Sequence, residues 1–506
     1  MISVVILVGA FLALLIRFWS RKGYPTPPGP KGLPFLGNIF QLPPFQFIRF
    51  MEWKEQFGPI FSLNLVGQPV IVINNLEIAT ELLERRSSIY ADRPRIIVAN
   101  EIMSGGLMLP IVPYGNLWKK LRKASHEGLS PQVVPLYQHA QELEAATLVQ
   151  NLINRPELWD EEIKKSTASS MRSTIYGAAP ISSISDPVVS YISDMGHRLT
   201  IAAMPGAYLV ELFPKMMNLP TWLAPWKREA KAWHKENTQK LQDLIQPAKD
   251  QDNDQQSFAA NLCSAGGRHH LTRKEEAWLT GSVFVAAYDT SSSTLRFFIL
   301  AMRLFPEVMK KAQAELDRVV GRERVPTFAD RENLPYIRAV TKELLRWGVA
   351  TPLGLPHRAQ QDDYYKGYFI PKGALVLVNS WGINRDPNTY PDPHEFRPER
   401  FLDPSGTTDI ILPGTHNQGH VTFGFGRRFC IGMNLAVQFQ FINVATLLWA
   451  ANVEAAHDKN GQIITPTNSP AGWVDEGIVV RPAPFRCNIV PRFDGAEAIL
   501  RRVRDS

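Results

Sequence analysis

The hydrophobic positions of this chain gather into three long runs, at residues 2–16, 278–305 and 434–449. Each run is longer than a typical strand, and length separates a buried helix from a buried strand where periodicity does not. The runs at 278–305 and 434–449 therefore predict two long buried helices. The first run contains Ser3 as its only polar side chain and needs a separate interpretation.

Short β-rich stretches lie between these runs. Residues 60–66 and 69–73 are separated by a glycine turn, which predicts a β-hairpin. Asn74 follows directly and predicts the cap of a helix over residues 74–86, with Glu77 placed as in a capping box.

The apolar run near the N-terminus is followed at once by Arg17, Arg21 and Lys22. It is short for a helix that spans a bilayer, and a cleaved signal peptide is the alternative. The positive charges follow the apolar run rather than precede it, and no small-x-small cleavage site comes after it. Residues 1–19 are therefore predicted to be a single-pass transmembrane signal anchor, and the positive-inside rule places the bulk of the protein in the cytosol.

Residues 20–34 are rich in proline, with four prolines between positions 25 and 30. Such a sequence cannot continue a helix and favours a stiff, extended segment. From the residues alone it is an ordinary linker between the anchor and one large domain over residues 35–506; a hinge is what the family resemblance described below implies.

The composition narrows the function without identifying it. The chain has 506 residues, of which 45% are hydrophobic, and a formal net charge of +7. An excess of basic residues favours binding to nucleic acid, an anionic membrane or an acidic protein partner. The sequence has no zinc-finger spacing, basic heptads or RNA-binding motifs, which argues against nucleic acid. Cys263, Cys430 and Cys487 form no C-x-x-C pattern, and they favour a reducing compartment.

The clearest chemical signal is the stretch F-G-F-G-R-R-F-C-I-G at residues 423–432. Its glycines allow a tight turn that places Cys430 just before the predicted helix at 434–449. The thiolate of a cysteine at the start of a helix is stabilised by the helix dipole and by nearby cations such as Arg428. Such a thiolate is a good axial ligand for haem iron, whereas an ordinary buried thiol is the alternative.

This stretch resembles the haem-binding signature of the cytochrome P450 superfamily, F-G-x-G-x-R-x-C-x-G, at Phe423, Arg428, Cys430 and Gly432. The resemblance implies the fold of that superfamily, mainly α with a small β subdomain and an N-terminal membrane anchor. It also implies that residues 35–506 form a haem-thiolate monooxygenase domain with haem b between two long helices. Cys430 would be the axial ligand of the iron.

Further positions resemble the superfamily's contacts with the haem propionates. Trp118 and Arg122 are four residues apart on a predicted helix, so both point from one face and can donate to one carboxylate. The superfamily uses a W-x-x-x-R pair in this way. His357 matches the position from which many members reach a propionate, and Arg358 beside it is the alternative.

The predicted helix at 278–305 carries Asp289 and Thr290 within A-A-Y-D-T-S. An acid and an alcohol inside an apolar helix are costly unless they are satisfied, and a mid-helix threonine often only bonds the carbonyl four residues earlier. The pair resembles the superfamily motif [AG]-G-x-[DE]-T-[ST], which relays protons to iron-bound oxygen. Ala287 stands in place of the usual glycine, and its effect stays open.

Glu343 and Arg346 lie one helical turn apart, and Arg400 follows in the stretch F-R-P-E-R-F. An E-x-x-R match alone is usually a surface ion pair. Because both stretches precede the Cys430 loop in the order found in the superfamily, the resemblance implies a charged triad beneath the haem. Its role would be structural.

Three stretches are expected to border the substrate. Leu353 and Leu355, in P-L-G-L-P-H-R, are expected to contact it. Residues 94–113 are predicted to be an irregular apolar loop that lines a cavity. Residues 201–226 are apolar and broken by prolines, and they resemble the roof of the superfamily's substrate channel, with a buried loop as the alternative.

The resemblance implies a monooxygenase that inserts one oxygen atom of O2 into a C–H bond of a small lipophilic substrate. Electrons from NADPH would come through a separate NADPH–cytochrome P450 reductase, with cytochrome b5 as a further donor, at a basic face near Lys119, Lys120 and Arg427. The anchor implies the endoplasmic reticulum membrane, with the catalytic domain facing the cytosol.

The anchor, the P-L-G-L-P-H-R stretch and the P-F-R-C tail most resemble fungal microsomal enzymes of secondary metabolism, of the O-methylsterigmatocystin oxidoreductase type. This implies a terpenoid, polyketide or alkaloid substrate, and the apolar stretch at 201–226 favours a terpenoid.

Three other classes are open at this stage. A haem-thiolate isomerase or dehydratase would need no reductase, a haem sensor would show no turnover, and a membrane-anchored scaffold would hold no haem. The pair Asp289 and Thr290 argues against the first two classes. The carbon monoxide spectrum of the reduced protein would distinguish the third.

Overall fold

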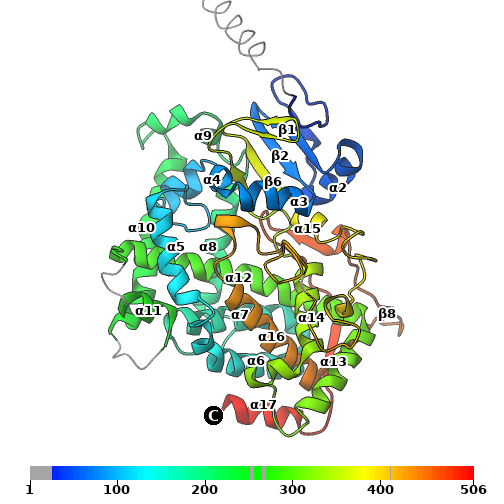
Figure 1. Ribbon diagram of the computed structural model, residues 1–506. Coiled ribbons are helices and arrows are strands. Elements are labelled where there is room, and N and C mark those ends of the chain that lie inside the picture. The colour runs from blue at the N-terminus through cyan, green and yellow to red at the C-terminus, as the bar shows by residue number, and fades with distance from the viewer. Residues whose placement is uncertain (1–24, 251–255, 265–268, 411, 506) are drawn as a thin grey trace, which may run out of the picture.

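The computed structural model describes residues 25–250, 256–264, 269–410 and 412–505. The predicted anchor at 1–19 and residues 20–24 of the predicted hinge lie outside the described residues. Helices make up most of the molecule, and short strands gather at one end and along one edge (Figure 1). This confirms the prediction of a mainly α protein with a small β subdomain.

The helices fall into a large group around the centre and several short ones near the strands. They are α2 (Gln46–Phe57), α3 (Leu76–Ala79), α4 (Ser87–Tyr90), α5 (Asn116–Leu129), α6 (Gln138–Asn154), α7 (Trp159–Tyr176), α8 (Pro187–Ala203), α9 (Leu209–Leu212), α10 (Pro225–Asp250), α11 (Phe258–Ser264), α12 (Arg273–Leu304), α13 (Pro306–Val319), α14 (Pro335–Trp347), α15 (Ser380–Ile383), α16 (Met433–Ala450) and α17 (Ala496–Arg504).

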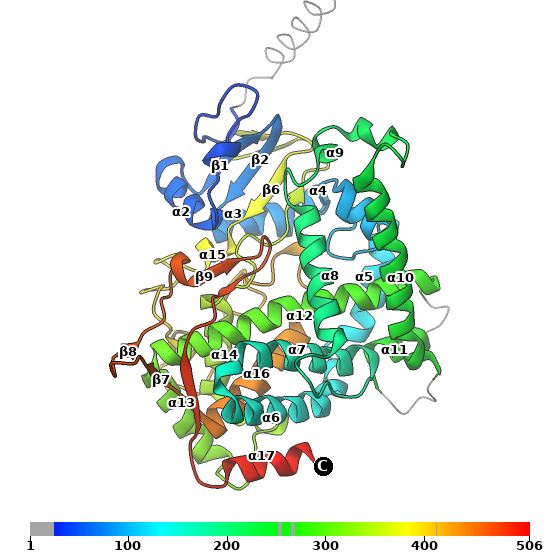
Figure 2. The same cartoon turned by 180° about the vertical axis from the view of Figure 1, so that it is seen from behind.

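The two long helices predicted from the hydrophobic runs, α12 and α16, form the centre of the molecule. α12 begins after Thr272, whose hydroxyl accepts the Glu275 N–H at 3.3 Å while the Glu275 carboxylate accepts the Thr272 N–H at 2.7 Å. It packs against α7, α8 and α16 (Figure 2). In the part of the chain that is described, α16 alone is long and apolar enough to cross a membrane, and 78% of it is buried inside the protein, as expected of a core helix.

The largest sheet has the strand order β1-β2-β6-β3, in which β2 and β6 are parallel and the other pairs antiparallel. β1 and β2 form the predicted hairpin, and its turn places Val66 and Gly67 in the left-handed region, with φ of 53° and 88°. The strands are β1 (Ile60–Leu65), β2 (Gln68–Ile73), β3 (His357–Arg358), β4 (Asp363–Tyr365), β5 (Tyr368–Ile370), β6 (Leu375–Val378), β7 (Ala451–His457), β8 (Ile463–Ile464), β9 (Trp473–Asp475), β10 (Val480–Pro482) and β11 (Cys487–Pro491).

The helix after the hairpin differs from its prediction at the cap. Asn75, not Asn74, is the N-cap, and its Oδ1 accepts a backbone N–H of the first turn at 3.0 Å. Asn74 is buried, and its Oδ1 accepts from Nδ2 of Asn379 at 2.8 Å, which ties the end of β2 to the segment after β6. Glu77 takes no part in a capping box; its carboxylate lies 3.2 Å from Nζ of Lys366. α3 then continues as a π-helix, η2 (Thr80–Arg85).

The segment at 94–113 is more ordered than predicted. It contains a π-helix, η3 (Ile97–Met103), in which the Ser104 N–H donates to the Ala99 carbonyl at 3.0 Å, the i→i−5 bond of that helix type. Most of its side chains are buried in the largest hydrophobic cluster. The prediction of an irregular segment is therefore wrong for residues 97–103, while residues 104–113 form only turns and bends, and the predicted cavity stays a prediction.

The described part of the predicted hinge is bound to the sheets. The Ser62 N–H of β1 donates to the Pro28 carbonyl at 2.8 Å, and the Phe369 N–H of β5 donates to the Pro25 carbonyl at 2.9 Å. Residues 25–30 thus run along the β subdomain. Their role as a hinge stays a prediction.

Candidate active site

The loop before α16 carries Cys430 three residues before the helix begins. Gly424 and Gly426 adopt φ of 77° and 55°, and a Cβ on Gly426 would lie 2.0 Å from the Leu83 carbonyl oxygen, so only glycine fits there. The Cys430 N–H donates to the Phe423 carbonyl at 2.9 Å, which closes the loop. Cys430 is exposed, while most of the loop around it is half-buried.

The groups around Cys430 shift the pKa of its thiol in opposite directions. Burial raises the pKa of the thiol, while the Gly432 N–H and the positive charge of Arg122 lower it. Gly432 is the N-cap of α16. The cation that lowers the pKa of Cys430 is Arg122 rather than the predicted Arg428, whose guanidinium donates to backbone carbonyls of two other segments.

Trp118 lies between two guanidinium groups. The Arg122 guanidinium lies 5.9 Å from its ring and the Arg428 guanidinium 4.6 Å from it. Trp118 and Arg122 therefore share one face of α5, as their spacing predicts, and this face meets the Cys430 loop. Burial lowers the pKa of Arg122, and attraction to Cys430 partly opposes this.

Arg428 is fixed by carbonyl groups of two other segments. Its Nε donates to the Ala91 carbonyl at 2.6 Å and its Nη2 to the Val112 carbonyl at 2.8 Å. Its Nη1 is buried and has no hydrogen-bond partner in the described part of the chain. Burial, with repulsion from Arg122, lowers the pKa of Arg428 to about 10.

Arg93 joins this cluster, and the sequence analysis missed it. Its Nε donates to the Pro110 carbonyl at 2.9 Å, and its Nη1 donates to the Leu355 and Pro356 carbonyls, each at 2.8 Å. Burial and repulsion from Arg428 lower the pKa of Arg93 to about 9. No motif marks this position, because the contacts that give it a role come from distant parts of the chain.

His357 is buried beside Arg93. Burial and the positive charge of Arg93 lower its pKa to about 3, so the ring is neutral at physiological pH. Its Nδ1 lies 2.8 Å from the Tyr90 carbonyl, which can only accept, so Nδ1 carries the proton and Nε2 has a lone pair. In this state His357 accepts rather than donates, and Arg93 supplies the N–H groups on this side. Arg358 lies 3.9 Å from the Asp92 carboxylate instead.

These residues fit haem b on chemical grounds. Arg93 and Arg428 are buried and Arg122 is half-buried, attraction to Asp92 compensates Arg93 and Arg428 only in part, and Arg428 also buries an unpaired N–H group. A buried charge is stable only when it is paired, so the cluster calls for an anionic ligand. The two propionates of haem b supply such carboxylates, and Cys430 beside Arg122 supplies a thiolate for the iron.

The acid and alcohol of α12 have different partners. The Thr290 hydroxyl donates to the Ala286 carbonyl at 2.8 Å, which is the ordinary mid-helix bond, and its lone pairs can accept. Asp289 faces α8, where a Cβ on Gly196 would lie 2.5 Å from the Asp289 Oδ2, so the missing side chain makes room for the carboxylate. Ala287 is partly buried against the hydrophobic core.

Asp289 has a strongly shifted pKa. Burial is the largest cause and repulsion from Glu476 adds to it, so the pKa rises to about 7 although Arg296 partly opposes the shift. Arg296 is bound to the buried carboxylate of Asp160 at 2.7 Å. Glu476 reaches this region from the turn between β9 and β10, a contact that no local sequence signal predicts.

The predicted substrate residues lie next to the cation cluster. Leu353 and Leu355 are both partly buried against the largest hydrophobic cluster. The Leu355 carbonyl accepts a hydrogen bond from the Arg93 guanidinium, so the backbone at Leu355 contacts the cation cluster. Substrate contact by these side chains stays a prediction.

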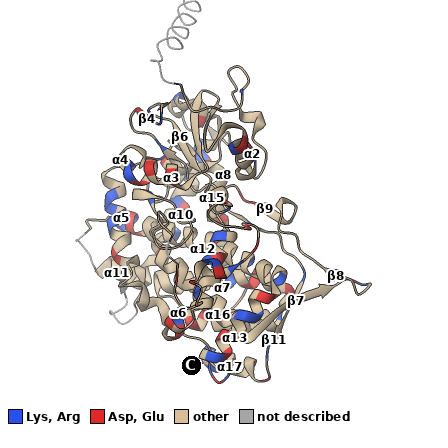
Figure 3. Cartoon of the chain, turned by 45° about the vertical axis from the view of Figure 1, so that its right-hand side comes forward, with Lys and Arg blue, Asp and Glu red and all other residues tan. Residues whose placement is uncertain are grey.

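The predicted basic face is smaller than expected. Lys119 and Lys123 are exposed on α5, which carries several basic residues (Figure 3). Arg427 is exposed as well, and it lies with Lys119 against the ring of Tyr114, each at 5.5 Å. Lys120 does not belong to this face, because its Nζ is paired with the Glu275 carboxylate of α12 at 2.9 Å.

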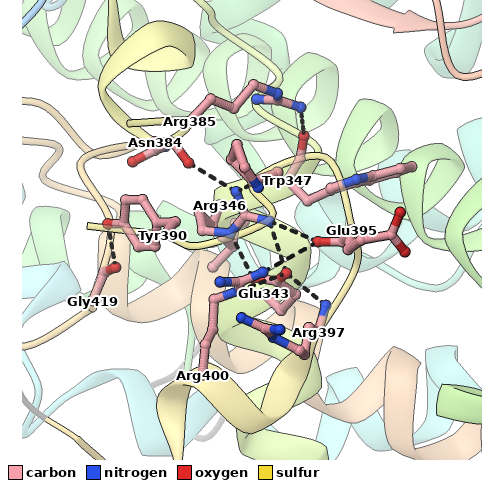
Figure 4. Close-up of polar contacts among 12 residues, drawn as sticks. Glu343, Arg346, Trp347, Asn384, Arg385, Tyr390, Glu395, Arg397, Arg400 and Gly419 are labelled. Atoms are coloured by element: carbon pink, nitrogen blue, oxygen red, sulfur yellow. Dashed lines mark hydrogen bonds and ion pairs between the residues drawn. The ribbon is translucent and has the colours of Figure 1, made fainter. Parts of the chain in front are cut away.

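Glu343, Arg346 and Arg400 are in mutual contact (Figure 4). The Glu343 carboxylate accepts from Arg346 at 2.6 and 2.8 Å and from Nε of Arg400 at 3.2 Å. Glu343 and Arg346 have no exposed side-chain surface. Arg346 also donates to the carbonyls of Asn384, Pro393 and Glu395, so the triad fastens the segment after α15 to α14.

Comparison with known proteins agrees with this geometry. The family model for Cytochrome P450 matches residues 27–487. Over 501 residues, the chain is 49% identical to cytochrome P450 monooxygenase 58 of Postia placenta, covering 98% of this chain and 95% of the relative. A cytochrome P450 monooxygenase of Armillaria gallica is 43% identical over 508 residues (100% and 97% covered), and monooxygenase iboC of Amanita muscaria is 35% identical over 554 residues (100% and 97% covered).

The chain therefore belongs to the cytochrome P450 family, and it is a monooxygenase of that family. Membership implies a haem iron with a thiolate ligand, the use of O2 and a redox partner that supplies electrons.

Replacing Glu343 with Gln removes the negative charge between Arg346 and Arg400. Because this leaves two buried cations without a counter-charge, we expect the free energy of unfolding to fall by about 3 kcal/mol, measured by urea denaturation of the haem-loaded protein. Glu307→Gln, which breaks an exposed ion pair with Lys310 (3.0 Å), should change it by less than about 1 kcal/mol. Equal losses in the two variants would contradict a locking role for the triad.

Proposed function

We propose that the chain is a membrane-bound monooxygenase of secondary metabolism that hydroxylates a lipophilic substrate with electrons from NADPH. One oxygen atom of O2 enters a C–H bond and the other leaves as water. The observation that carries this proposal is that one fold contains Cys430, a cluster of cations beside it, and an acid whose pKa is near neutrality.

The residues present have separable tasks in this reaction. Cys430 would bind the iron through its Sγ, and Arg93, Arg122 and Arg428 would hold the two propionates. When bound, the haem supplies the activation of O2. Asp289, with a pKa of about 7, is protonated in part at neutral pH and can donate that proton, and the Thr290 hydroxyl, already donating to Ala286, can accept a hydrogen bond.

Electrons would come from a separate NADPH–cytochrome P450 reductase, with cytochrome b5 as a further donor. The exposed cations Lys119, Lys123 and Arg427 lie on the same side as the Cys430 loop and suit an acidic partner. The short chain path from Arg427 to Cys430 would bring such a partner close to the iron.

A membrane location at the endoplasmic reticulum is supported by exposed apolar side chains as well as by residues 1–19. They belong to two segments, residues 33–40 and 209–223, which lie at the end of the molecule that carries β1 and α9 (Figures 1 and 2). Patches of this kind are uncommon on a surface that faces only water. Their members are Leu33, Phe35, Leu36 and Phe40 in one group and Leu209, Leu212, Phe213, Trp222 and Leu223 in the other.

The substrate class is tested by titrating the ferric protein with terpenoids, polyketides and alkaloids and measuring the spin state of the iron. We expect a terpenoid to shift the iron to high spin and to be hydroxylated in the presence of reductase, NADPH and O2. A shift by another class alone would overturn the terpenoid preference. Conversion of the ligand without NADPH would overturn the monooxygenase reaction in favour of an isomerase.

The pKa of Asp289 gives a pH test of its role. The protonated carboxyl predominates below about pH 7 and the carboxylate above it, so product formation should fall as the pH rises through that value. Asp289→Asn cannot pass a proton on, and we expect product formation to drop by about 10- to 100-fold and to lose this pH dependence.

Ser292→Ala is the control for this prediction, because the Ser292 hydroxyl donates only to the Asp289 backbone carbonyl at 3.1 Å. It should keep the rate and the pH profile. An Asp289→Asn enzyme with the original rate and profile would exclude Asp289 as the proton donor.

A further inference from the structure

The segment that leads into the Cys430 loop has an unusual backbone. Four residues between positions 414 and 419 adopt positive φ: Gly414 (77°), His416 (50°), Asn417 (63°) and Gly419 (77°). Glycine adopts this conformation freely, whereas histidine and asparagine do so only where the surrounding structure supports it. Two such residues in succession point to a role for one of their side chains.

The His416 side chain makes two contacts that hold it in this conformation. Its ring packs against the ring of Phe429, with the centroids 4.2 Å apart and an interplanar angle of 39°. Its Nε2 lies 2.6 Å from Oε1 of Glu84, and because a carboxylate oxygen can only accept, Nε2 is the donor. His416 thus connects Glu84 of η2 to the residue that directly precedes Cys430.

The backbone on either side of His416 is fixed by buried groups. Thr415 is buried, and its hydroxyl accepts the Gly419 N–H at 3.0 Å. The Gly419 carbonyl accepts from the Tyr390 hydroxyl at 2.7 Å. Because these contacts hold the chain before and after His416, its ring is a fixed support for Phe429.

Phe429 transmits this support to the Cys430 loop. Its ring also meets the ring of Phe423 edge-to-face at 6.4 Å, and the Phe423 carbonyl accepts the Cys430 N–H at 2.9 Å. The Phe429 N–H donates to the Gly426 carbonyl at 3.0 Å. A displacement of Phe429 would therefore move the backbone that carries the Cys430 side chain.

η2 contacts the same loop at a neighbouring point. A Cβ on Gly426 would lie 2.0 Å from the Leu83 carbonyl oxygen, so the two backbones are in direct contact. The next residue of η2, Glu84, holds His416. η2 thus supports the loop directly through Leu83 and indirectly through His416.

We propose that His416 is a positioning residue for Cys430, which, held by Glu84, packs against Phe429 and so keeps Sγ in place to bind the iron. His416 acts through Phe429 rather than on the iron. The proposal rests on Cys430 as the axial ligand, and it is independent of the substrate and of the electron donor.

The test compares three variants with the unchanged full-length, haem-loaded protein. His416→Asn removes the ring, and asparagine is among the residues that adopt positive φ most readily, so the backbone can stay as it is. Glu84→Gln keeps an acceptor oxygen for His416 but removes the charge. Glu77→Gln is the control, because Glu77 precedes η2 and pairs with Lys366 at the surface (3.2 Å).

The first measurement is the rate at which the reduced protein loses its thiolate-type carbon monoxide spectrum at constant temperature. We expect this rate to rise about tenfold in His416→Asn and about threefold in Glu84→Gln, because the first loses the aromatic contact and the second only the charge. Glu77→Gln should match the unchanged protein. Equal rates in all four proteins would overturn the proposal.

Urea unfolding of the same variants separates positioning from general stability. We expect His416→Asn and Glu84→Gln to lose the thiolate-type spectrum at urea concentrations where the helical circular dichroism signal is still complete. Loss of the spectrum in step with unfolding in both variants would mean that His416 only stabilises the fold, which would overturn the proposal.

The third measurement is hydrogen exchange at the Cys430 amide, which reports the loop without using haem chemistry. We expect faster exchange in His416→Asn and Glu84→Gln but not in Glu77→Gln. Unchanged exchange in every variant would overturn the support of the loop by His416. Faster exchange in an otherwise unchanged series whose parent protein shows no thiolate-type spectrum would instead overturn Cys430 as the iron ligand, on which the proposal rests.

Discussion

Three neighbouring guanidinium groups, those of the buried Arg93 and Arg428 and the half-buried Arg122, set the main constraint on this structure. Within the described residues none of them forms an ion pair, and repulsion of Arg428 from Arg93 and from Arg122 adds to the cost of burial, while attraction to Asp92 offsets part of it for Arg93 and Arg428. A protein tolerates such a cluster only if an anion compensates it. The cluster therefore defines a binding site for carboxylates, and it lies where the Cys430 thiolate can face the same ligand.

The surrounding architecture serves to hold these groups in place. Arg428 is anchored by carbonyls at Ala91 and Val112, and Arg93 by carbonyls that flank the start of β3. The Cys430 loop closes on its own backbone at the start of α16, a helix that is buried over most of its length. The Glu343 triad fixes the segment between α15 and the loop. Loss of any of these contacts would shift the guanidinium groups relative to the Cys430 thiolate.

The sequence predicted what depends on local structure. The Cys430 loop, the shared face of Trp118 and Arg122 and the two long helices follow from glycine positions, helical spacing and hydrophobic length. What depends on distant contacts was not predicted. The Arg93 side chain is held by carbonyls near residue 355. The pKa of Asp289 is raised by burial and in part by Glu476, which lies in the turn between β9 and β10. The cap at Asn75 was displaced by one residue because Asn74 is used by a tertiary hydrogen bond.

The central claim is that Cys430 binds haem iron as a thiolate. The most direct test is the carbon monoxide difference spectrum of the reduced full-length protein, compared with Cys430→His and with Cys487→Ser as a control at a buried thiol. The account predicts a thiolate-type spectrum for the unchanged protein and for Cys487→Ser, and its loss in Cys430→His. A thiolate-type spectrum that survives Cys430→His, or that is missing from the unchanged protein, would contradict it.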